Sequence, residues 1–171
     1  MSDYMKCIHT GSLEFGDDFA TQKEVLDLFG LQKGKGKGVH GVYDLPGSGN
    51  VKVCLFKGDE RGGWHHWRKQ GDGIDRRGWN EATGINDFCD DQDEALEYVQ
   101  SEMDNPSTRY VFYKMEWKGM TWWKFFGVFE LDQDATNCLN NPPMAFRDWF
   151  DGYRCYFKRV SKTLDLNRTV A

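Results

Sequence analysis

The stretch RYVFYKMEWKGMTWWKFFGVFELD, residues 109–132, decides the fold class of this chain. Aromatic and β-branched residues fill two runs, 109–117 and 121–132, and Lys118-Gly119 separates them. Such residues favour strands, and a short break containing glycine between two strand-like runs is typical of a β-hairpin. We therefore predict an antiparallel pair of strands that turns at Lys118-Gly119. On the second strand, Phe126 and Val128 should lie on opposite faces.

Two segments outside this hairpin predict helices. In residues 18–29, Thr21 and Glu24 have the spacing of a capping box, and Gly30 can end the helix. In residues 90–103, acidic residues crowd the first turn, apolar residues share one face, and a proline follows the end. We expect both helices to pack against the sheet.

Two more runs predict strands, VKVCLF at 51–56 and RCYFKRV at 154–160. Together with the hairpin they indicate an α+β fold. Its sheet should be a strongly bent antiparallel or mixed one, or a small barrel, flanked by two or more helices, with the glycine-rich segments as loops on its rim. The 171 residues suffice for one compact core, and no linker divides them, so we predict a single domain over 1–171.

The composition is that of a globular protein, with 39% hydrophobic and 29% charged residues. The first residues lack the basic start and apolar run of a signal peptide, and no apolar run reaches the roughly 20 residues of a membrane span. We expect a cytoplasmic protein. Its five cysteines are dispersed without a CxxC pair, which indicates reduced thiols, with Cys54 and Cys155 in the core.

Charge is unevenly distributed along the chain, whose formal net charge is −5. Residues 31–80 contain ten lysines and arginines against five acids, whereas residues 87–104 contain eight acids and no lysine or arginine. A local basic patch can steer an anionic ligand even when the total charge is negative. The overall acidity argues against tight DNA binding that ignores sequence.

The most unusual segment is GGWHHWRKQGDG, residues 62–73, which lies within what we call the aromatic–basic segment, residues 61–80. Adjacent histidines on a strand point to opposite faces, and no zinc-ligand spacing accompanies them, so we expect no metal. No nucleophile elbow is present, and GKGKG at 34–38 lacks the helix that must follow a nucleotide loop. We expect no cofactor and no catalytic residue here.

Aromatic faces interleaved with cations suit stacking on bases and neutralisation of phosphates. Capping of the core is an alternative role for a tryptophan, and turn formation is one for the aspartates. The candidate base-binding residues are Trp64, Trp67, Trp79, His65, His66, Asp72 and Asp75. The candidate phosphate-binding residues are Lys33, Lys35, Lys37, Arg61, Arg68, Lys69, Arg76 and Arg77.

The order of these motifs resembles the SRA-like, PUA-related domains attached to HNH endonucleases of modification-dependent restriction systems. The resemblance covers about residues 20–161 and depends on Phe29-Gly30, Gly71-Asp72-Gly73 and the run 125–129. It departs where Arg68-Lys69-Gln70 stands in place of the usual Tyr-Thr-Gly-x-Gly step, and no HNH-like cluster follows. The resemblance implies a bent barrel that binds DNA carrying a modified base or backbone, often by flipping a nucleotide into an aromatic pocket.

We therefore expect a stand-alone module of prokaryotic or phage defence type that binds nucleic acid, most simply duplex DNA, without catalysis of its own. A separate nuclease subunit would then supply any cleavage. Two alternatives stay open. One is a protein-interaction or phage-type inhibitor domain whose acidic segment 87–104 mimics DNA. The other is a small metal-dependent nuclease using Asp104, Glu116 and Lys118.

Overall fold

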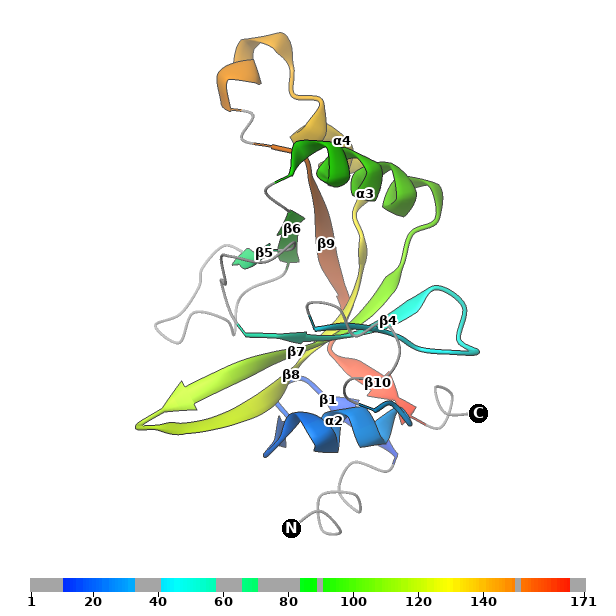
Figure 1. Cartoon of the computed structure of the whole chain (residues 1–171), viewed down its shortest axis with the longest axis vertical. Helices are drawn as coiled ribbons and strands as arrows, with labels where there is room; N and C mark the ends of the chain where they lie inside the picture. The colour runs from blue at the N-terminus through cyan, green and yellow to red at the C-terminus, as the bar shows by residue number, and fades with distance from the viewer. Residues whose placement is uncertain are drawn as a thin grey trace. The chain divides into compact units, whose positions relative to one another are not determined.

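The structure, a computed structural model, describes residues 11–32, 41–57, 66–70, 84–88, 91–149 and 152–166 (Figure 1). The chain divides into two compact units. The first unit consists of Met1–Lys57, Thr108–Val128 and Val160–Ala171, and the second of Gly58–Ser107 and Phe129–Arg159. Both units are therefore assembled from segments that are far apart in the sequence.

The predicted hairpin forms the centre of the first unit. Strand β7 spans Thr108–Trp117 and strand β8 spans Met120–Leu131, so the turn between them has two residues. Lys118 and Gly119 both have positive φ, 48° and 79°. A two-residue turn of this kind matches the right-handed twist of the paired strands. The predicted position of the turn is confirmed.

Three shorter strands extend the hairpin. Strand β4 (Val51–Phe56), predicted from the sequence, pairs in parallel with β7, and β3 (Val42–Asp44) pairs antiparallel with β4. Strand β2 (Asp18–Phe19) adds to β8. The strand order β3-β4-β7-β8 is thus a mixed sheet, as expected. A separate ribbon pairs β1 (Ser12–Glu14) with β10 (Thr163–Asp165).

The first predicted helix is shorter than expected. Helix α2 spans Gln22–Leu28, and the hydroxyl of its N-cap, Thr21, accepts a 3.2 Å hydrogen bond from the Glu24 amide. The Glu24 carboxylate in turn accepts from the Ala20 amide at 3.0 Å. The predicted start at Asp18 is wrong, because Asp18 and Phe19 pair with β8, and the Thr21 cap sets the first helical residue at Gln22, four residues later.

Aromatic side chains are buried on both faces of the sheet in the first unit. On one face, α2 packs through Phe29 onto Phe112, which also contacts Phe125 with ring centroids 5.2 Å apart. Val128 belongs to this same cluster. Phe126 instead contacts Tyr113, with ring centroids 5.0 Å apart. The intervening Gly127 has φ 122° and breaks the two-residue alternation. This packing supports the prediction that Phe126 and Val128 lie on opposite faces.

The second unit contains the end of β8 and three further strands in the order β9-β6-β5. These are β9 (Arg154–Ser161), β6 (Gly84–Phe88) and β5 (His66–Gln70), and both pairings are antiparallel. Ile85 and Phe157, which are register partners, are both fully buried. The predicted strand at 154–160 is confirmed, whereas β5 and β6 were not predicted.

Three helical segments belong to the second unit. Helix α3 (Gln92–Asp104) closely matches the prediction, with Asp91 as its N-cap. Helix α4 (Gln133–Asn140) and the 3-10 helix η1 (Met144–Trp149) were not predicted. In the described residues, no helix has the length and apolar character needed to cross a membrane.

Helix α4 continues the hydrogen bonding of β9 beyond the point where β8 ends. The Asn140 amide group accepts from the Arg154 amide at 2.8 Å and donates to the Arg154 carbonyl at 2.7 Å. The Thr136 hydroxyl accepts from the Tyr156 amide at 3.0 Å. Four residues of helix rise about 6 Å and two residues of strand about 6.6 Å, so the two spacings match. The side chains of α4 thereby replace a neighbouring strand.

The fold class is thus α+β, with a mixed sheet and three α-helices in the described residues. The small barrel is not found, because the strand order has two ends, β3 and β5, and the sheet in the described part of the chain is open. The core positions of Cys54 and Cys155 are confirmed, since both side chains are fully buried.

Candidate nucleic-acid interface

Four of the predicted binding residues lie on strand β5, which is His66, Trp67, Arg68, Lys69 and Gln70 in order. The expectation of a rim loop is wrong for these residues. Their backbone pairs with β6, in a register that places Trp67 opposite Asp87 and Lys69 opposite Ile85. Pairing with a neighbouring strand decided the conformation, which local propensity had left open.

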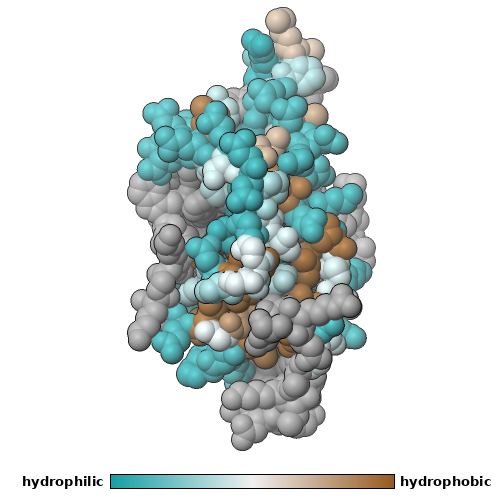
Figure 2. Space-filling model, turned by 90° about the vertical axis from the view of Figure 1, so that its right-hand side faces the viewer, coloured by the Kyte–Doolittle hydropathy of each residue, from teal (hydrophilic) through white to brown (hydrophobic). Residues whose placement is uncertain are grey.

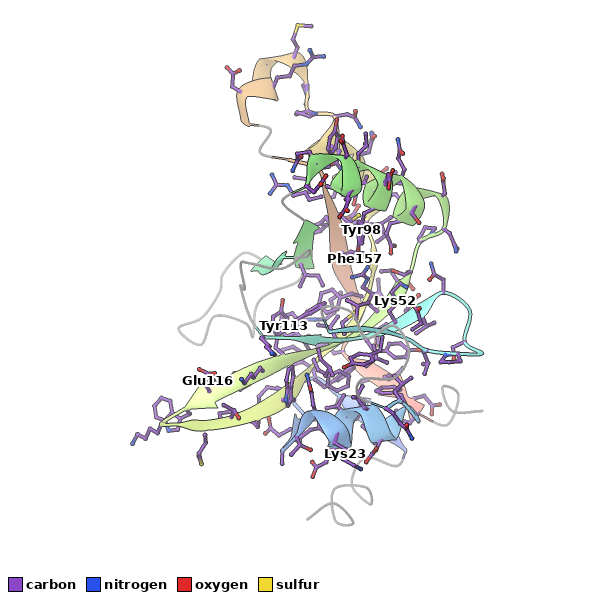
Figure 3. The ribbon with its side chains drawn as sticks, in the orientation of Figure 1. Lys23, Lys52, Tyr98, Tyr113, Glu116 and Phe157 are labelled. Atoms are coloured by element: carbon purple, nitrogen blue, oxygen red, sulfur yellow. The ribbon has the colours of Figure 1, made fainter. Side chains whose placement is uncertain are left out.

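Strand β5 ends the strand order, so it is an edge strand among the described residues. Its neighbour β6 pairs with β9, and in that pairing Ile85 is buried opposite the buried Phe157, which Figure 3 labels. An edge strand on a buried scaffold can present its residues to a ligand with little freedom of the backbone. The part of the aromatic–basic segment that is described is therefore held by the sheet.

The remaining predicted site residues lie outside the described residues, and their roles stay predictions. They are Lys33, Lys35, Lys37, Arg61, Trp64, His65, Asp72, Asp75, Arg76, Arg77 and Trp79. The structure accordingly brings together only residues 66–69 of the predicted set.

Some acids of the acidic segment, residues 87–104, stabilise the local fold, and others are exposed. Asp91 caps α3 by accepting from the Asp93 and Glu94 amides at 3.0 and 3.2 Å. Glu102 is buried and accepts from the Ser107 amide at 3.0 Å. Other acids on α3 remain exposed, and hydrophilic residues dominate this face of the helical region in Figure 2. Three of the exposed acids, Asp93, Glu97 and Asp104, are spaced four and seven residues apart, so they lie on the same side of the helix.

A hollow of about 500 Å³ lies in the second unit, beside α3 and α4. Four of its lining residues have carboxamide side chains, and one of them, Asn140, is hydrogen-bonded to β9. Its lining residues are Leu96, Val99, Gln100, Met103, Asp104, Thr136, Asn137, Asn140, Asn141 and Tyr153. The sequence could not indicate this hollow, because α4 was not predicted. Asp132, an N-cap residue followed by an acid in the first turn, was the signal that could have revealed α4.

The tip of the β7–β8 hairpin carries exposed apolar side chains that the sequence did not single out for binding. Trp117 and Met120 are each 62% exposed, and the Lys118 ammonium lies 5.5 Å from the centre of the Trp117 ring. The signal was present in the sequence as a lysine-glycine turn flanked by tryptophan and methionine. The sequence alone did not indicate how far this turn lies from the buried core.

The residues of the nuclease alternative do not form a metal site in the described part of the chain. The Glu116 carboxylate, on the projecting part of the hairpin in Figure 3, lies 3.8 Å from the Lys114 ammonium. Among the described residues, no group of three or more histidine, cysteine or acidic side chains is gathered as metal ligands would be.

No protein-family profile matches the sequence, and no curated protein matches it. The comparison of structures gives a different result. The fold is similar to part of a restriction enzyme. The solved structure of the 5-hydroxymethylcytosine-specific restriction enzyme AbaSI superposes with a TM-score of 0.62 at 14% sequence identity. The match covers 95% of this chain and 44% of the enzyme chain. At this level of identity, the likeness shows a shared fold.

Proposed function

We propose that this chain is a nucleic-acid-binding module that reads DNA carrying a modified base or backbone, without catalysis of its own. The observation that carries the proposal is the fold likeness, over 95% of the chain, to an enzyme named for its specificity for 5-hydroxymethylcytosine. The SRA-like resemblance of the sequence points to the same class of ligand independently of that superposition.

The aromatic–basic segment supplies the chemistry for such binding. Extruding a base from a duplex costs a few kcal/mol, and stacking on an aromatic ring offsets a comparable amount. Trp64, Trp67 and Trp79 are the candidates for stacking, while Arg68 and Lys69 would contact adjacent phosphates. Strand β5 supports this assignment, because it fixes the backbone of Trp67, Arg68 and Lys69 at a sheet edge.

This chain spans less than half of the length of the enzyme chain, so the enzyme's cleavage activity is not carried over to it. We propose that a separate nuclease subunit cleaves the DNA that this module selects. Copurification of a nuclease with this chain, dependent on the modified duplex, is the expected result of that arrangement.

A second candidate function has one observation in its favour. The exposed acids of α3 at positions 93, 97 and 104 lie on one side of the helix, which is the arrangement needed to imitate a line of phosphates. On this alternative, the chain binds a DNA-binding protein and does not bind DNA. Replacing these acids by their amides would abolish partner binding, whereas the same variant would bind DNA at least as well if the first proposal holds.

The deciding experiment is a binding screen with short duplexes of one sequence that differ only in modification. The set contains unmodified, methylated, hydroxymethylated, glucosylated and phosphorothioate duplexes, each titrated at two salt concentrations. We expect one modified duplex to bind at least about tenfold more tightly than the unmodified one, equivalent to about 1.4 kcal/mol. Equal affinity for all five duplexes would contradict modification-specific reading, and absence of binding to any would contradict DNA binding itself.

Matched charge variants identify the surface that is responsible. Lys69→Ala removes a cation from β5, and Lys23→Ala removes one from α2, where it is paired with Asp27 at 2.7 Å. Both variants have the same net charge. We expect Lys69→Ala to weaken DNA binding and Lys23→Ala to leave it unchanged. Equal effects would indicate that only the total charge matters.

A further inference from the structure

The distal part of the β7–β8 hairpin extends beyond the core of the first unit (Figure 1). Tyr113 on β7 and Trp123 on β8 are buried, whereas every residue from Glu116 to Thr121 is exposed. Trp117 lies four residues after Tyr113 along the strand, a distance of about 13 Å. The tip is therefore a narrow two-stranded ribbon that contributes nothing to the core.

The turn places its two large apolar side chains together. Because the loop has only two residues, Trp117 and Met120 are the last opposed pair and point to the same face of the ribbon. Lys118 occupies a left-handed conformation, with φ 48°, which asparagine or glycine would adopt at lower cost. Relative to those residues, lysine adds a positive charge at the end of the ribbon.

That charge is available for an external anion. The structure shows no carboxylate paired with Lys118 within the described ranges, and its ammonium lies over the Trp117 ring at 5.5 Å. The neighbouring carboxylate, Glu116, lies 3.8 Å from Lys114 instead. An exposed ring, an exposed thioether and a cation that has no carboxylate partner among the described residues thus occupy one end of the hairpin.

We propose that this hairpin tip is a wedge for duplex DNA, with Trp117 and Met120 against a base step and Lys118 at the adjacent phosphate. The proposal deepens the proposed function and rests on it. A two-stranded ribbon fits a DNA groove, and apolar side chains pushed between base pairs unstack the step. Stacking on tryptophan compensates for part of the lost stacking, and a lysine beside it meets the phosphate.

The small size of the tip favours DNA over a second protein. A stable protein–protein interface buries about 800 Å² on each partner, and six residues at the end of a ribbon provide much less. A membrane surface is also poorly matched, because membrane binding grows with the apolar area that is buried, and the tip offers only the two large apolar side chains of Trp117 and Met120. A base step needs only the two apolar side chains and one cation that the tip supplies.

The test uses the full chain and a short duplex, carrying the modification that binds best, with 2-aminopurine beside successive base steps. Unstacking of 2-aminopurine raises its fluorescence, so the wild type is expected to increase the signal at one step. Trp117→Ala should abolish the increase and weaken binding about 5- to 150-fold, and Trp117→Phe should retain most of both. Met144→Ala is the matched control for Met120→Ala, because Met144 is 78% exposed in the second unit.

Each outcome distinguishes the two proposals. If the wild type binds no duplex, the proposed function fails and the wedge fails with it. If the wild type binds but Trp117→Ala and Met120→Ala keep the affinity and the fluorescence increase, only the wedge is wrong. Trp117-dependent self-association, or Trp117-dependent binding to phosphatidylserine vesicles without any 2-aminopurine signal, would also overturn the wedge. Thermal melts are expected to show no change for either tip variant, and a lower melting temperature with unchanged affinity of the folded protein would make the tip structural.

Discussion

The two ends of the β7–β8 hairpin carry the same kinds of side chain in opposite environments. At its root, Phe112 and Phe125 are fully buried and pack against each other, with their ring centroids 5.2 Å apart. At its tip, Trp117 and Met120 are 62% exposed. A large apolar residue at the root contributes to folding free energy, whereas one at the tip is free to contribute to binding. The content of aromatic residues alone therefore does not locate a binding site in this chain.

The largest expected effect contrasts the root with the tip directly. Phe112→Ala should lower the free energy of unfolding by about 3–5 kcal/mol, because it leaves a cavity among packed rings. Trp117→Ala should change it by no more than about 0.5 kcal/mol. Urea unfolding followed by fluorescence and far-UV circular dichroism measures both. If residues 1–171 form one cooperative domain, fluorescence and circular dichroism should report the same unfolding transition. Equal losses of unfolding free energy in the two variants would contradict the contrast between root and tip.

The second effect concerns the electrostatic part of DNA binding, which does not depend on the DNA sequence. Replacing Lys33, Lys35 and Lys37 together should reduce the slope of log affinity against log salt by about 2.7 and weaken binding about a hundredfold at 0.15 M salt. The reason is that three fewer phosphates would be neutralised. Filter binding across a salt series, with modified and unmodified duplexes, measures the slope. An unchanged slope with lost selectivity would show that these lysines do not contact the backbone.

The sequence predicted the hairpin, the strand 51–56 and helix α3 because each has a strong local signal: alternating aromatic residues, a β-rich apolar run or a capped amphipathic turn. It failed where tertiary pairing decides. Strand β5 contains no such pattern and forms against β6. Asp18 and Phe19 have helical neighbours in sequence but pair with β8. Closure of the sheet is likewise a property of strand order, which no local pattern encodes.

For the candidate site, residue chemistry was predictable but exposure was not. The aromatic–basic segment was recognised from its composition, and the structure adds the strand that supports residues 66–69. The hairpin tip was recognised only as a turn, because sequence alone does not tell how far a strand extends beyond the last buried residue. Exposure of Trp117 depends on which residues of β7 contact α2 and β8.

In the second unit, two adjacent asparagines repeat the contrast between root and tip. Asn140→Ala should cost about 1–3 kcal/mol, because it leaves the Arg154 amide and carbonyl without the hydrogen bonds that Asn140 makes at 2.8 and 2.7 Å. Asn141→Ala is the matched control and should change stability by no more than about 0.5 kcal/mol, since Asn141 is exposed and, among the described residues, its side chain bonds only to Asn137. Urea midpoints compare the two, and equal costs would indicate that α4 does not replace a strand beside β9.

Strand β5 offers a test between a binding and a core role for a tryptophan. If Trp67 stacks on a base, Trp67→Ala should weaken DNA binding by about 1–3 kcal/mol with little change in stability. The same range applies to Trp64→Ala. Titrations and thermal melts on the two variants separate the roles. A loss of about 3–5 kcal/mol of folding stability, with unchanged affinity of the folded molecules, would assign the ring to the core and contradict the site.

The smallest effect is also the one with opposite signs on folding and binding. Lys118→Asn should raise the free energy of unfolding by up to about 1 kcal/mol, because asparagine adopts the left-handed conformation of this turn more readily than lysine. The same change removes the cation beside Trp117, so DNA affinity should fall and the salt slope should decrease by about 0.9. Glu116→Gln is a control that raises the charge at the same tip and should not weaken binding. If Lys118→Asn stabilises the protein and leaves the salt slope unchanged, Lys118 does not contact a phosphate and the turn has only a structural role.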